Sequence, residues 1–105
     1  MIARVWQGAT RAADAERYAA YMHQTGVREL AATPGNRGVL LSHRIEGELA
    51  RFTVLSLWDS LEAVRAFAGR RPERALFYPQ DEAFLVERGP IVEHWTVDEL
   101  VGLGA

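Results

Sequence analysis

The chain has 105 residues, with 12 basic and 14 acidic side chains and a formal net charge of −2. This length fits one domain with a single modest core, and we expect residues 1–105 to form it. The charge supplies no positive field for a phosphate backbone, so no nucleic-acid partner is expected, and the lack of cysteine excludes disulfides and thiolate sites.

The N-terminal segment predicts a strand and then a helix. Ile2–Gly8 is apolar and partly alternating, which is typical of a strand. It resembles neither a signal peptide nor a membrane span, so we expect a cytoplasmic protein that does not enter the membrane. A polar break at 10–11 leads to Asp14, a candidate N-cap. Apolar residues then recur at steps of three or four up to Leu30, and Thr25-Gly26 is expected to kink this first helix.

The middle of the chain predicts a hairpin and a second helix. Thr33–Asn36 ends the first helix, because it combines proline, glycine and asparagine. Gly38–Ile45 and Arg51–Trp58 predict strands, and their short glycine-containing connection indicates an antiparallel pair. Asp59, as the N-cap, begins the second helix, which is expected to end at Gly69.

The C-terminal third predicts two helical turns, at 74–77 and 82–87, and a last strand at Ile91–Val97. The order strand, helix, strand, strand, helix, strand is the ferredoxin-like βαββαβ arrangement of the α+β class. Right-handed crossovers place both helices on one face of a four-stranded antiparallel sheet.

The other face of this sheet lacks a cover of its own. Four strands of ordinary length leave roughly 300 to 350 Å² of it bare, which is at the edge of what a soluble monomer tolerates. We therefore expect a homodimer in which two sheets pack face to face. The apolar residues available to one face or the other are Leu40, Thr53, Leu55, Leu57, Val92 and Val97.

Several segments, taken in order, resemble the antibiotic biosynthesis monooxygenase-like family of dimeric α/β-barrel proteins. They are Thr33–Gly38, Ser56–Ser60, Ala66–Gly69, Phe77–Pro79 and Val92–Trp95. The resemblance spans nearly the whole chain and implies one domain of this family. Its members include small enzymes that oxygenate phenols or quinols without metal or organic cofactor, and relatives that degrade haem.

The family's functional residues match this chain only in part. Trp58 is similar to the tryptophan that both branches carry at the end of this strand. The oxygenating branch has an asparagine four residues earlier, where this chain has Val54, and the haem-degrading branch has one on the first strand, near Trp6 and Gln7. The histidine that holds haem iron would fall at 77–80, where the chain has none. We therefore expect no haem and no other cofactor.

Three residues are candidates for catalytic roles. His94, whose imidazole has a reference pKa of about 6.5, could accept a phenolic proton at neutral pH. Trp58 could stack on an aromatic substrate, and Tyr78 could orient a substrate oxygen. The alternative for each residue is structural: a hydrogen-bonded histidine in the sheet, a packing tryptophan, and a tyrosine that closes the core.

Five further residues are candidates for substrate binding. Trp6 and Arg4 share a face of the first strand and could form a stacking wall and an anion anchor, although a surface or interface pair is the more ordinary arrangement. His43 depends on the register of its strand. Phe67 and Met22 are expected in the core between helix and sheet, where they could also line a pocket.

These observations favour a cofactor-independent monooxygenase acting on a small aromatic phenol or quinol. The three histidines lack metal-ligand spacing, so no metal site is expected. Val54, in place of a polar asparagine, keeps another class open: a non-catalytic dimeric module that binds a small hydrophobic molecule or a partner protein. An isomerase on the same scaffold is a third possibility.

Overall fold

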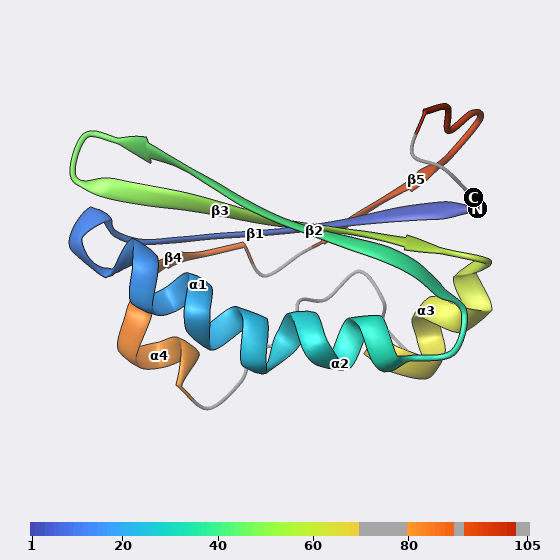
Figure 1. The fold of residues 1–105 in the computed structure, drawn as a ribbon, viewed down its shortest axis with the longest axis horizontal. Coiled ribbons are helices and arrows are strands. Elements are labelled where there is room, and N and C mark those ends of the chain that lie inside the picture. The colour runs from blue at the N-terminus through green and yellow to red at the C-terminus, as the bar shows by residue number, and fades with distance from the viewer. Residues whose placement is uncertain (70–79, 90–91, 103–105) are drawn as a thin grey trace.

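The computed structural model describes residues 1–69, 80–89 and 92–102. Figure 1 shows two layers, a long twisted sheet and a row of helices along one of its faces. The elements, in chain order, are β1 (Ile2–Arg11), a 3₁₀ turn η1 (Ala12–Asp14), α1 (Ala15–Gln24), α2 (Gly26–Ala32), β2 (Asn36–Glu46), β3 (Leu49–Trp58), α3 (Leu61–Ala68), α4 (Asp81–Phe84), β4 (Leu85–Arg88) and β5 (Glu93–Thr96).

The sheet has the strand order of the ferredoxin-like fold, which confirms the expected fold class. Its order is β2-β3-β1-β4, with β5 also paired to β1, and every pairing is antiparallel. On β1, β5 pairs with 2–5 and β4 pairs with 8–10. Because β3 occupies the other edge of β1, β4 and β5 together fill the place of the expected fourth strand.

The split of this last strand corrects two expectations. The helical turn expected at 82–87 is confirmed only in its first half, because α4 ends at Phe84 and Leu85–Arg88 is strand β4. Strand β5 begins at Glu93 instead of Ile91, which lies outside the described residues. The pairing with β1 explains why β4 is a strand. The backbone N–H and C=O groups of residues 8–10 need hydrogen-bond partners on this edge, and β4 provides them.

Other boundaries moved by a few residues for local reasons. Thr10, expected in a polar break, is fully buried in β1 opposite Ala50 of β3. Ser60, not Asp59, is the N-cap of α3, because its Oγ accepts a hydrogen bond of 3.2 Å from Ala63 N. The kink expected at Thr25-Gly26 is confirmed, because it separates α1 from α2.

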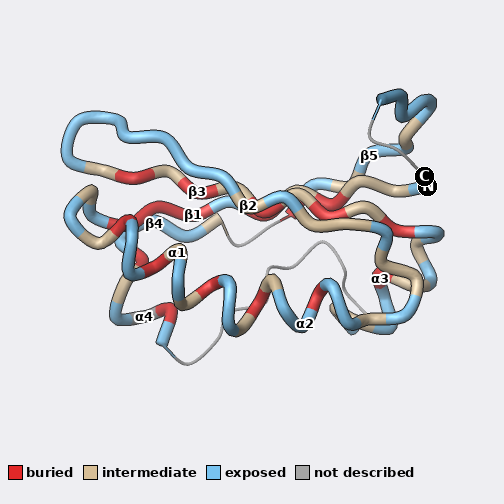
Figure 2. Tube along the Cα trace, in the orientation of Figure 1, coloured by how far each residue is buried: buried red, intermediate tan, exposed pale blue. Residues whose placement is uncertain are grey.

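Alternation along the strands decides which residues face the helices. In β3, even-numbered residues from Ala50 to Trp58 are buried and the odd-numbered ones are half-buried. In the β1–β3 pairing, the even-numbered residues of β1 from Ile2 to Thr10 lie opposite these buried residues and share their face. Figure 2 shows the result as buried segments concentrated in the central strands and on the sheet-facing side of the helices. The core therefore lies between the sheet and the helix layer.

The opposite face of the sheet carries no helix among the described residues. Leu40 and Trp95 on this face are 59% and 58% exposed, and Leu40 pairs with Leu55 of β3. Val92, whose side of the sheet the sequence left open, is a buried core residue. We call this surface the open face.

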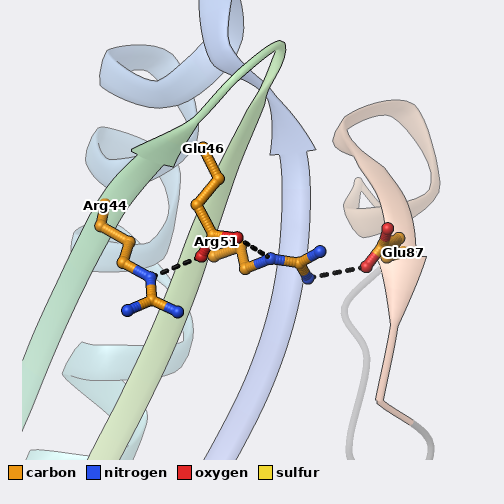
Figure 3. A network of polar contacts seen from close by, with 4 residues as sticks. All are labelled: Arg44, Glu46, Arg51 and Glu87. Carbon is orange, nitrogen blue, oxygen red and sulfur yellow. Dashed lines mark hydrogen bonds and ion pairs between the residues drawn. The ribbon is translucent and has the colours of Figure 1, made fainter.

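One end of the open face is polar. Arg51 on β3 donates to Glu46 at 3.0 Å and to Glu87 of β4 at 2.8 Å, and Arg44 on β2 donates to Glu46 at 2.5 Å. Figure 3 shows how this network joins three strands. The pKa of Glu46 is lowered by the hydrogen bonds from Arg51 and then Arg44.

Candidate functional site

A small pocket lies between the sheet and the helix layer. Its cavity is about 20 Å³, which is room for about one water molecule. The sheet supplies the floor, and α1, α2, α3 and α4 each supply at least one residue of the wall. The lining residues are Arg4, Trp6, Val54, Met22, Gly26, Leu30, Phe67 and Asp81.

Arg4 brings a positive charge into this apolar pocket. It is only 3% exposed, because strand alternation places it on the same face as Trp6. Its guanidinium carbon lies 5.6 Å from the centre of the Phe67 ring, a cation–π contact. Ser56 of β3 and His94 of β5 are its cross-strand neighbours. The expectation of a surface pair at Arg4 and Trp6 is therefore wrong, because both side chains are buried.

Trp6 forms the aromatic part of the floor. Its indole lies against the backbone of Gly8, where an added Cβ would come within 2.8 Å of the ring. Leu85 of β4 closes the other side of the same glycine, at 3.1 Å from that position. Gly8 therefore gives the indole the space that it needs beside β4.

Asp81 brings a negative charge to the pocket, and the sequence interpretation missed it. It is 1% exposed, and its Oδ1 accepts a hydrogen bond of 2.9 Å from the hydroxyl of Tyr18, which is also fully buried. Burial, and next the charge of Asp81, raise the pKa of Tyr18 well above its ordinary range. The hydroxyl therefore stays protonated and remains a donor to Asp81.

No local signal could have revealed this pair. Tyr18 looks like an ordinary member of the apolar stripe of the first helix, and Asp81 follows a loop-forming segment. The two residues are 63 positions apart in the sequence. Only the way in which α4 packs against α1 brings them together.

His94 and Trp58 lie near the pocket but are not among its lining residues. His94 shares the helix-facing side of the sheet with Arg4, its partner in the β1–β5 pairing. Trp58 is fully buried, its indole N–H donates to Ser56 Oγ at 2.8 Å, and its ring lies 5.8 Å from Phe67. Their catalytic roles stay predictions.

The structure separates His43 from this pocket. Its ring stacks on Phe52 at 5.0 Å between centres and lines a wider groove of about 600 Å³, together with Arg44 and Arg51 of the polar network. Tyr78 lies outside the described residues. The structure thus brings together Arg4, Trp6, Met22 and Phe67 of the predicted site residues.

The described part of the chain lacks two other features, a metal-ligand cluster and a membrane-spanning helix. No group of three or more histidine, cysteine, aspartate or glutamate side chains gathers there as metal ligands do. None of its helices is both long and apolar enough to cross a membrane.

Comparisons with known proteins find this fold in solved structures. No family model matches the sequence, and no curated protein does. A Deinococcus radiodurans protein assigned provisionally as an antibiotic biosynthesis monooxygenase aligns with a TM-score of 0.69 and 12% identity, over 100% of both chains. The haem degrader MhuD of Mycobacterium tuberculosis, with two haems in its active site, gives 0.62 and 20%, over 97% of this chain and 100% of that one. Rv0793 of the same organism gives 0.58 and 15%, over 96% and 98%.

These likenesses show the fold of the chain. The chain has the ferredoxin-like α+β fold of the antibiotic biosynthesis monooxygenase-like proteins. The resemblance seen in its sequence segments is confirmed at this level. Sequence identities of 12 to 20% show the fold and not the chemistry.

Proposed function

We propose that the protein is a small cofactor-independent monooxygenase that acts on a phenol or quinol in the pocket between sheet and helices. Arg4 holds the oxygen anion of the substrate, while Trp6 and Phe67 contact its ring. The ring of such an anion is electron-rich and can reduce dioxygen. One oxygen atom then enters the ring to give a quinone, and the other leaves as water.

One observation supports this proposal above the others: a buried guanidinium lies among aromatic and aliphatic walls. A guanidinium keeps its charge at every ordinary pH, so it gives the pocket a fixed positive charge that attracts an anionic ligand. The same arrangement would favour the phenolate over the phenol, because a nearby positive charge stabilises the charged form.

The pocket must widen to admit an aromatic ring. Its present 20 Å³ holds about one water molecule. Met22 is the lining residue best suited to move, because it is unbranched and has three rotatable side-chain bonds. The break between α1 and α2 lies beside the pocket at Gly26, where the helix layer is interrupted.

Oxygen uptake tests the function directly. Metal-free protein is mixed with a panel of phenols and quinols, and we expect uptake that requires both protein and substrate. Arg4→Met keeps the apolar length of the side chain and removes its charge, so kcat/KM should fall by about 100-fold. Arg65→Met, an exposed arginine on α3, is the matched control and should retain activity. A folded wild-type protein that consumes no oxygen with any compound contradicts the proposal.

Val54 favours a second candidate, a non-catalytic module that binds small hydrophobic molecules. It is 3% exposed and lines the pocket at the position where the oxygenating branch is expected to carry asparagine. A valine cannot donate a hydrogen bond to a developing oxyanion. A ligand-induced rise in Tm without turnover would support this candidate, and product formation without oxygen would support an isomerase.

Haem is not part of the proposal. Haem iron is usually held by histidine, cysteine, methionine or tyrosine. The sequence has no histidine at 77–80, and the lining residues in the described part of the chain include no histidine, cysteine or tyrosine. Met22 is the lining residue that could reach iron, and we assign it to the hydrophobic wall.

We also propose that the protein acts as a homodimer joined through the open face. Leu40, Leu55 and Trp95 would leave water when two such faces meet, and each buried apolar Å² contributes roughly 25 cal/mol. A two-fold axis would use the same surface twice. The pocket lies on the other side of the sheet, so dimerisation leaves it accessible.

A further inference from the structure

The open face has an apolar end and a polar end. Its residues form rows across the sheet, because cross-strand partners lie side by side on one face. The rows near the start of β1 are mostly apolar, and their charged member, Glu93, lies on the outer strand β5. Their apolar members are Ala3, Val5, Leu40, Leu55, Leu57 and Trp95. The rows near the end of β1 hold the polar network of Figure 3.

One row of the polar end has opposite charges on its two outer strands. The pairing runs from Arg44 on β2 through Arg51 and Ala9 to Glu87 on β4. Arg44 and Glu87 are therefore three strand spacings apart, which is roughly 14 Å. This separation is too large for an ion pair within one protomer. Arg51 lies between them and donates to Glu87 at 2.8 Å.

Arg44 and Glu87 each have polar atoms that make no hydrogen bond to the described part of the chain. Arg44 donates to Glu46 at 2.5 Å through Nε, and its two terminal nitrogens have no partner there. Glu87 accepts through Oε2, whereas its Oε1 has no partner there. The two side chains are 77% and 51% exposed. One edge of the open face therefore offers donors to a partner, and the other edge offers an acceptor.

A second copy can pack face to face on this surface in two ways. Aligned sheets keep their strands within about 30° of each other, so the two-fold axis runs nearly along the strands or nearly across them. An axis across the strands lays the apolar end of each copy on the charged end of the other. Arg44 and Arg51 would then be buried against leucines, which is costly for a charge. An axis along the strands joins like ends and avoids this cost.

The axis along the strands also brings opposite charges together. It places β2 of one copy over β4 of the other, within the same row of residues. Arg44 then faces the partner's Glu87, and Glu87 faces the partner's Arg44. Stacked sheets lie about 10 Å apart, a gap that an arginine and a glutamate reaching from opposite sides can bridge. In the next row, the amide of Gln7 faces the hydroxyl of the partner's Thr53.

We propose that the two-fold axis of the dimer runs along the strands and that Arg44 and Glu87 form two symmetric ion pairs between the subunits. This inference rests on the proposed homodimer and adds its orientation and its recognition residues. Each pair joins the network of one subunit to that of the other, because Arg44 already contacts Glu46 and Glu87 already contacts Arg51. The reversed arrangement lacks these pairs, so the charges select one orientation.

Mixing two charge-reversal variants tests this orientation. Arg44→Glu faces the partner's Glu87 in its own dimer, and Glu87→Arg faces the partner's Arg44, so each variant repels its own copy twice. A mixed dimer with one subunit of each variant restores both attractive pairs. Contacts inside a subunit are the same in mixed and unmixed dimers. Any preference for the mixed dimer therefore arises between the subunits.

In an equimolar mixture at low salt, roughly four-fifths or more of the dimers should be mixed, whereas random pairing gives about half. The three dimers differ in net charge, so ion-exchange chromatography separates and quantifies them. Random pairing of these variants, with a wild type that is dimeric, would overturn the inference and uphold the homodimer. A wild type that is monomeric would overturn both.

Arg65→Glu and Glu62→Arg are the matched control pair. Both residues are exposed on α3, in the helix layer on the other side of the sheet. These variants change the net charge by the same amounts as the test pair, so repulsion between whole subunits would act on them equally. We expect random pairing. A preference for mixed dimers as strong as that of the test pair would overturn the inference.

A cross-link keeps the test decisive if a charge reversal prevents folding. The chain has no cysteine, so Arg44→Cys and Glu87→Cys in one chain introduce its only thiols. A bismaleimide shorter than their separation within a subunit joins them only between subunits. We expect covalent dimers from the double variant and none from Arg44→Cys alone. A folded, dimeric double variant that forms no covalent dimer would overturn the inference.

Discussion

Arg4 lies in the core because of its position in a strand and in spite of its charge. Residues two apart in a strand share a face, so Arg4 accompanies Trp6 toward the helices. The sequence predicted that these two residues share a face. It could not predict which face, because Val5 and Ala3 are just as compatible with the core. The structure shows that the face shared by Arg4 and Trp6 is the one that the helices cover.

Met22 controls the size of the pocket in our account. Met22→Ala should widen the cavity and lower the free energy of unfolding by about 2 to 5 kcal/mol, because a buried side chain is removed. The same change should tighten the binding of a small phenol, because the space no longer has to be opened. Urea denaturation and calorimetric titration measure the two effects.

Val101→Ala is the control for this change. Val101 is 76% exposed, so its truncation should shift neither stability nor affinity. Weaker binding of every phenol by a folded Met22→Ala protein would show that Met22 is a contact and not a barrier.

At the scale of elements, the turn between α2 and β2 is held against α3 through Gly35. This glycine has a positive φ of 89°, and an added Cβ would lie 2.5 Å from the Cβ of Ala63. Its carbonyl accepts a hydrogen bond of 2.8 Å from Asp59 N at the start of α3. The turn predicted from proline and glycine therefore also sets the place of the second crossover helix.

Gly35→Ala should destabilise the protein by about 2 to 4 kcal/mol, the sum of backbone strain and a clash. Gly47→Ala measures the backbone strain alone, because Gly47 also has a positive φ but has open space around its Cβ position. This variant should lower the free energy of unfolding by about 1 to 2 kcal/mol. Ala63→Gly should recover the difference in the double variant, measured by urea denaturation. Additive losses at positions 35 and 63 would show that the two residues do not clash.

The polar network of the open face should make stability depend on acid pH. Arg51 and Arg44 lower the pKa of Glu46 from an ordinary value of 4.5, so the unfolded chain takes up its proton first. The contribution of Glu46 to the free energy of unfolding is then complete above pH 4.5. It is lost as the pH falls through the lower pKa of Glu46 in the folded protein. Arg51→Gln should flatten this part of the profile of urea midpoint against pH, whereas Arg28→Gln, an exposed arginine of α2, should leave it in place. Parallel profiles for all three proteins would contradict the role of the network.

The sequence predicted the elements with clear periodicity better than those without it. Alternation and turn residues located the three long strands and both crossover helices to within a few residues. Strand β4 was missed because its four residues are too few to show a period. It is a strand because it pairs with the edge of β1 that β3 does not occupy. The hydrogen bond between Tyr18 and Asp81 was also missed, because it depends on tertiary packing.

At the scale of the whole molecule, the bare sheet face predicts assembly. The wild type should sediment at about twice its protomer mass of 11.7 kDa. Leu40→Glu should give a folded monomer, because Leu40 is 59% exposed within one protomer and a charge there would be buried in the dimer. Gln24→Glu, on the exposed side of α1, should remain a dimer. A wild type that sediments as a single subunit at micromolar concentration would contradict this assembly.

The fold carries two separate surfaces, a helix-covered pocket and an open sheet face, and our account assigns the chemistry to the first. The structure of the protein with a bound phenol or quinol tests that assignment most directly. We predict that the ring lies between Trp6 and Phe67, with one oxygen within hydrogen-bond distance of the Arg4 guanidinium. A ligand bound instead in the groove beside His43 and Arg44, with the pocket unchanged, would contradict the account.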